Sequence, residues 1–117
     1  MRVSRRLLCV ADMKESDWKR YKKIRADALE AYCELVLAAC VEIASPNGES
    51  AHTRYLKMFD MIAERDRALA DMFDGLSRSS ASFQLSLMVR HGLVGESQVI
   101  EFTDEFRDEV RRLAGLH

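Results

Sequence analysis

AYCELVLAACVEIAS, residues 31–45, predicts a helix that is apolar on nearly every side. With a step of about 100° per residue, its polar stripe shrinks to Glu34 and little else. Leu37 and Val41 occupy directions that are polar one turn earlier. A helix that is apolar all round is normally buried, and leaving these two side chains in water would forgo roughly 1.5–3 kcal/mol each. We therefore expect protein to cover them.

Two kinds of cover are compatible with this pattern. Three shorter helices of the same chain could surround one half of the long helix. Otherwise the extra apolar stripe is a subunit interface, most simply that of a two-fold homodimer. In the second case we expect the interface to contain Leu37, Val41 and Glu34.

Capping and helix-breaking residues divide the chain into helices. Ser16 can cap the first helix, and Pro46 with Gly48 forces a turn after it. No segment alternates as a surface strand would. The predicted helices run over residues 16–44, about 51–74, about 80–91 and 97–114. The sequence thus predicts an all-α, four-helix bundle-like domain over residues 16–117, with a long first helix and a basic N-terminal arm over residues 1–15.

The second predicted helix has a clear apolar face. We expect this face to point into the core; its members are Tyr55, Met58, Phe59, Ile62, Leu69, Met72 and Phe73. Asp66 falls in direction between Tyr55 and Phe59, so we expect its carboxylate to be desolvated. A buried charge needs a partner. We predict a buried polar pair of Asp66 with Arg25 or with Arg65, which either fixes packing or forms a ligand site inside the bundle.

The 117 residues are enough for one domain, and the composition is that of a folded protein, with 48% hydrophobic and 32% charged residues. The net charge is −1, but residues 1–25 carry +6 and the remainder −7. This arm could contact nucleic acid or lie on an acidic protein surface. The possible nucleic-acid contacts are Arg2, Arg5, Arg6, Lys19, Lys22 and Lys23.

The three cysteines do not predict a disulfide framework. Cys33 and Cys40 are seven residues apart on one helix, roughly 10 Å along its axis, which is too far for a bridge. We interpret them as small hydrophobic residues of a reducing compartment. The apolar run Leu7–Ala11 is shorter than a signal peptide requires, and no stretch approaches the ~20 apolar residues of a membrane span. We expect a cytoplasmic protein without a membrane partner.

A serine-rich segment, SRSSAS, could supply an anion site from Arg78, Ser79 and Ser80, although helix capping alone also explains its serines. The sequence offers no metal-ligand constellation, cofactor motif or catalytic motif. We therefore expect a small non-catalytic helical protein, acting by self-association and by binding another macromolecule. The alternatives are a nucleic-acid accessory factor that uses the basic arm, and an enzyme or small-ligand binder with its site around Asp66 and Arg25.

Overall fold

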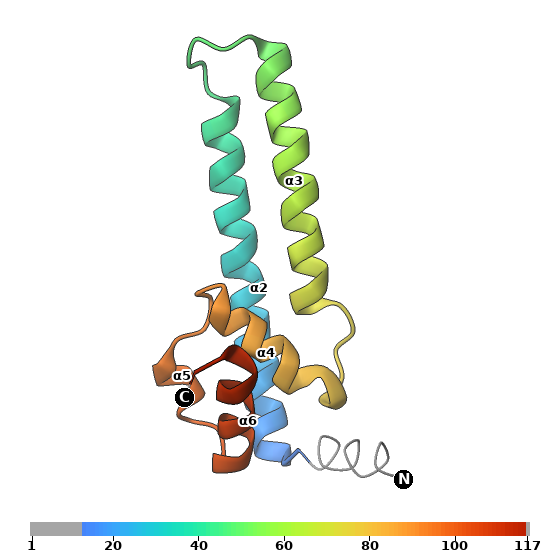
Figure 1. The fold of residues 1–117 in the computed structure, drawn as a ribbon, viewed down its shortest axis with the longest axis vertical. Helices are drawn as coiled ribbons and strands as arrows, with labels where there is room; N and C mark the ends of the chain where they lie inside the picture. Colours follow the sequence, from blue (N-terminus) through green and yellow to red (C-terminus); the bar gives the residue numbers. More distant parts are fainter. Residues whose placement is uncertain (1–12, 117) are drawn as a thin grey trace.

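The computed structural model describes residues 13–116, and this part of the chain is all-α (Figure 1). The long first helix is confirmed. The elements are α2 (Glu15–Ala44), α3 (Ala51–Phe73), the 3-10 turn η1 (Arg78–Ser80), α4 (Ala81–Arg90), α5 (Glu96–Val99) and α6 (Asp104–Ala114).

The helices form two regions. Helices α2 and α3 pair as a long antiparallel hairpin, and α4, α5 and α6 gather around the N-terminal half of α2 (Figure 1). We call the part formed by α4, α5 and α6 the base. Helix α4 packs on α6, on α3 and on α2, so it joins the base to the hairpin. The distal half of the hairpin extends beyond the base (Figure 1).

The core lies where the base meets the hairpin. Tyr21 and Ile24 of α2 are buried there, together with Met72 at the end of α3 and Leu85 of α4. The buried positions of α2 recur at steps of three and four residues, which is the spacing of one helix face. That face runs through Asp17, Tyr21, Ile24, Ala28 and Tyr32, and no residue of α2 beyond Tyr32 is buried.

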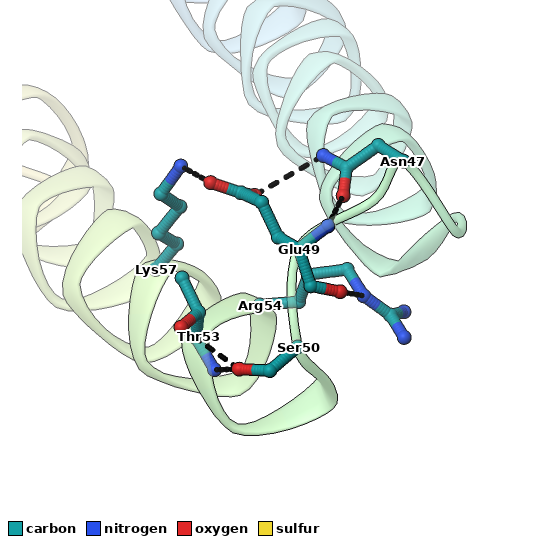
Figure 2. A network of polar contacts seen from close by, with 6 residues as sticks. All are labelled: Asn47, Glu49, Ser50, Thr53, Arg54 and Lys57. Carbon is teal, nitrogen blue, oxygen red and sulfur yellow. Dashed lines mark hydrogen bonds and ion pairs between the residues drawn. The ribbon is translucent and has the colours of Figure 1, made fainter.

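Polar contacts close the tip of the hairpin (Figure 2). The Ser50 hydroxyl accepts a hydrogen bond from the Thr53 amide at 3.0 Å and so caps α3. Asn47 Oδ1 accepts from the Glu49 amide, while the Glu49 carboxylate pairs with Lys57. The hydrogen bond from Lys57, followed by that from Asn47, lowers the pKa of Glu49 below its usual range. These polar contacts connect the turn to the first turns of α3.

Most helix ends agree with the sequence prediction, and two differ. Ser16 is not a cap, because α2 begins at Glu15 with Lys14 at the N-cap position. The single fourth helix over residues 97–114 is wrong: α5 ends at Val99, and α6 starts only at Asp104. Phe102 in the break is 3% exposed, so the interruption lets the chain bury this ring while it changes direction.

Candidate association surface

Leu37 and Val41 are not covered by the rest of residues 13–116. Leu37 is 60% exposed and Val41 is 68% exposed. The expectation that shorter helices surround this half of α2 is therefore wrong, because the base reaches only the other end of the helix (Figure 1). Glu34 is exposed as well. Cover by a second copy stays a prediction.

Helix α3 presents a matching row of exposed apolar side chains. Tyr55 is 65% exposed, Phe59 63% and Ile62 43%. With Asp66 and Leu69 they follow steps of four, three, four and three residues, the spacing of a coiled-coil seam. The expected core face of α3 is thus buried only at its C-terminal end, where Met72 and Phe73 enter the core.

A row with the same spacing runs along α2, through Cys33, Leu37, Cys40 and Ala44. The two rows lie on the same side of the hairpin, because they border one groove of about 220 Å³. Its lining residues are Tyr32, Cys33, Val36 and Leu37 of α2, with Ile62, Arg65, Asp66 and Leu69 of α3. We define the hairpin face as Cys33, Leu37, Cys40 and Ala44 of α2, together with Tyr55, Phe59, Ile62 and Leu69 of α3.

The opposite side of the hairpin differs in character. Leu35 is 62% exposed but lies about 160° around α2 from Leu37, since the two are separated by two residues. Its neighbours along that side, at steps of four and three, are Ala31, Ala38 and Glu42. The large exposed side chains of the hairpin face come mainly from α3, whereas this side of α2 carries one exposed leucine among small and charged residues.

The predicted buried polar pair is not formed. Asp66 and Arg65 are exposed, and no hydrogen bond or ion pair involves the Asp66 side chain within residues 13–116. The helical periodicity correctly predicted that Asp66 points between Tyr55 and Phe59, but the rings of these two residues are themselves exposed. Arg25 is part-buried and instead donates to the carbonyl of Phe73, with its guanidinium over the Phe73 ring. Arg25 thus joins the N-terminal half of α2 to the end of α3, and we call this end of the hairpin its root.

Two buried polar contacts escaped the sequence prediction. The Tyr21 hydroxyl donates to Gln84 Oε1 at 3.1 Å, and Gln84 Nε2 donates to the carbonyl of Asp74. Burial raises the pKa of Tyr21 to about 12. Asp17, 1% exposed, accepts hydrogen bonds from the backbone amide and the hydroxyl of Thr103, directly before α6. Tyr21 and Gln84 are 63 positions apart in the sequence, and Asp17 and Thr103 are 86 positions apart. Local sequence patterns therefore could not predict these contacts.

The groups of the predicted anion site are already engaged. Arg78 forms an ion pair with Glu15 at 2.7 Å, and its guanidinium lies over the Trp18 ring. The Ser80 hydroxyl donates to the carbonyls of Gly75 and Ser77. Ser79 is exposed and lies within 3.3 Å of the Ser77 hydroxyl. Arg78 therefore ties the 74–80 connection to α2, while the hydroxyls of Ser79 and Ser80 make contacts within that connection. Anion binding by these three residues stays a prediction.

The basic residues divide into two groups. Arg2, Arg5 and Arg6, and with them most of the predicted basic arm, lie outside the described residues. Lys19, Lys22 and Lys23 are exposed on the root of α2, where Lys22 lies over the Trp18 ring and Lys23 pairs with Asp27 at 2.8 Å. A nucleic-acid contact through these side chains stays a prediction.

Two kinds of feature are absent from residues 13–116. No cluster of three or more His, Cys, Asp or Glu side chains is placed to hold a metal ion there. None of the helices in this range combines the length and the apolar character needed to cross a bilayer.

Comparison with protein-family models, with curated proteins and with solved structures gives no match to this chain.

Proposed function

We propose that this protein is a small non-catalytic helical protein that acts by self-association through the hairpin face, as an adaptor or accessory factor. The supporting observation is that Leu37, Tyr55, Phe59 and Ile62 of the hairpin face are between 43% and 65% exposed, and that Val41 at its border is 68% exposed. Contiguous apolar surface of this kind marks interaction sites in soluble proteins.

The apolar gain from association can be compared with its cost. Full burial of a large apolar side chain contributes about 1.5–3 kcal/mol. These side chains have roughly half of their surface in water, so each has roughly 1 kcal/mol still to gain. Summed over two copies, the gain of roughly 10 kcal/mol falls within the ~4–15 kcal/mol that association costs in lost freedom. The gain and the cost are of the same size, so the affinity of such a dimer depends on how closely the two faces fit.

The groove fits a protein side chain better than a small ligand. Its volume of about 220 Å³ is below the ~300–1,000 Å³ of typical ligand pockets. Its walls are mostly apolar, and its two charged residues, Arg65 and Asp66, are both exposed. In coiled coils, apolar side chains repeated at heptad spacing on one helix insert between the side chains of the facing helix, and they could fill this groove in the same way.

Light scattering on a sizing column tests the proposal. The wild-type chain should shift from the mass of one chain to that of two as its concentration rises. Leu37→Glu and Phe59→Glu should remain monomeric, because each places a carboxylate in the apolar seam. Leu35→Glu is the matched control: the same substitution at an equally exposed leucine on the other side should leave the dimer intact. A wild-type chain that is monomeric up to about millimolar concentration, the weak limit of specific association, would reject the proposal.

A further inference from the structure

The hairpin has a defined register between its helices. The Arg25 guanidinium donates to the carbonyl of Phe73, the Tyr32 hydroxyl to that of Arg65, and Arg54 to that of Ala44. The two residue numbers of each pair add up to 97 or 98. A residue of α2 therefore lies at the same height along the hairpin as the residue of α3 whose number brings the sum to about 97.

This register puts complementary side chains at the same level on the outer borders of the hairpin face. Lys23, Glu30 and Val41 form a nearly straight row on α2, because steps of seven and eleven residues are close to whole turns. By this register they lie at the same height along the hairpin as Asp74, Arg67 and Leu56 of the other helix. These three residues also form a nearly straight row, because they too are separated by seven and eleven residues. All six residues are exposed. The pairs are basic with acidic, acidic with basic, and apolar with apolar.

Within one chain these rows do not meet. Arg67 lies roughly 140–160° around α3 from Leu69 and Met72, which pack into or against the core, so it points away from α2. Neither Glu30 nor Arg67 takes part in an ion pair within the described residues. Lys23 pairs with Asp27 along its own helix, but within the described residues no ion pair links the two rows inside a single copy.

The arrangement of two copies decides whether the rows meet. A two-fold axis parallel to the hairpin, in the plane of contact, places α2 of each copy over α3 of the partner at the same level. The borders then face each other: Glu30 meets the partner's Arg67, Lys23 meets the partner's Asp74, and Val41 packs on the partner's Leu56. An axis across the hairpin would instead set α2 against α2 and α3 against α3, which places these residues at unrelated levels.

Building on the self-association proposed above, we propose that two copies pair through their hairpin faces about a two-fold axis parallel to the hairpin, with both bases at the same end. The two hairpins then form a four-helix bundle with charged pairs along its borders, as in coiled coils.

The base leaves room for this arrangement. It covers the side of α2 that contains Asp17, Tyr21, Ile24 and Ala28. Leu37 is nine residues beyond Ala28, which is half a turn around the helix. The base and the partner copy therefore occupy opposite sides of α2.

A distance measurement tests the orientation. A nitroxide carried by a non-natural amino acid at Ser16, which is exposed at the start of α2, avoids the native cysteines of the hairpin face. With bases at the same end, the two labels should lie roughly 15–30 Å apart, from helix spacings of about 8–10 Å and the label arms. Bases at opposite ends would separate them by roughly 60 Å, from the 1.5 Å rise per residue. A dimer with the longer distance overturns this inference and leaves self-association standing, whereas a monomeric wild-type chain overturns both.

Charge reversal is a second, independent test of this arrangement of the two copies. Glu30→Arg and Arg67→Glu each turn two symmetric attractions into repulsions and should raise the dimer Kd about tenfold at low salt. The double variant restores the pairs and should recover most of the affinity. Glu42→Arg, on the other side of α2, is the matched control and should have little effect. Single reversals without effect, or a double variant that adds the two losses, would overturn the arrangement.

Discussion

Replacing Asp66 by leucine should strengthen self-association. Asp66 is the one charged member of the seam along α3 and borders the apolar groove between Ile62 and Leu69. In the single chain its carboxylate is exposed and forms no hydrogen bond or ion pair with the rest of residues 13–116. Contact with a second hairpin would remove it from water without a partner provided by its own chain.

The size of the effect follows from that burial. Burying an unpaired neutral polar group costs about 1–3 kcal/mol in protein mutation data, a carboxylate costs at least as much, and a symmetric dimer buries two such groups. Since the groove is open at its border, we take the lower end, about 2–3 kcal/mol for the dimer. That corresponds to a decrease of the dimer Kd by about 30- to 150-fold. The free energy of unfolding of the monomer should change by no more than about 0.5 kcal/mol, because the site is exposed.

Sedimentation velocity over a concentration series gives the Kd of the wild type and of Asp66→Leu. Glu64→Leu is the matched control, since it also replaces an exposed carboxylate of α3 by leucine, but about 160° around the helix. An unchanged Kd for Asp66→Leu, or an equal decrease for both variants, would show that Asp66 is not at the interface and would refute the reasoning.

Three further predictions concern the root of the hairpin and its distal half. Asp17→Ala should lower the free energy of unfolding by about 2–4 kcal/mol in urea titrations, because two charge-assisted hydrogen bonds to Thr103 are lost inside the core; a loss below about 0.5 kcal/mol would contradict their burial. Burial raises the pKa of Tyr21 from 10.0 to about 12, so its contribution is complete below pH 10 and lost as the pH rises towards 12. Tyr21→Phe should therefore lose less stability than wild type over this window in thermal unfolding, and equal losses would contradict the assignment. In hydrogen exchange at low concentration, amides of residues 36–44 should exchange faster than those of residues 17–28, and the difference should shrink as the chain associates; uniform protection in the monomer would contradict it.

The sequence predicted what depends on neighbouring residues. The end of α2 before Pro46 and the two ends of the helix expected over about 51–74 depend on local signals, and each lies within a residue or two of its expected place. Relative directions were also predictable: Asp66 does lie between Tyr55 and Phe59 around α3. The inference from direction to burial failed there, because an apolar face is buried only if something packs on it.

The contacts that fix the base could not be predicted, for a related reason. Asp17 is one acid among several at the start of a helix, and only the approach of Thr103 from 86 residues away makes it a buried acceptor. The break between α5 and α6 likewise coincides with long-range contacts, because Phe102 is buried there and Thr103 bonds to Asp17.

The distribution of contacts separates folding from association in this chain. Specific buried contacts concentrate at the root, where Tyr21 bonds Gln84, Asp17 bonds Thr103 and Arg25 bonds the end of α3. Because α2 continues from that root as one uninterrupted helix to Ala44, fixing the root also fixes the direction of the distal half. The tip is closed by polar contacts that require no apolar neighbour (Figure 2). The apolar side chains between root and tip can therefore stay in water without unfolding the chain, which is the condition a preformed association face has to meet.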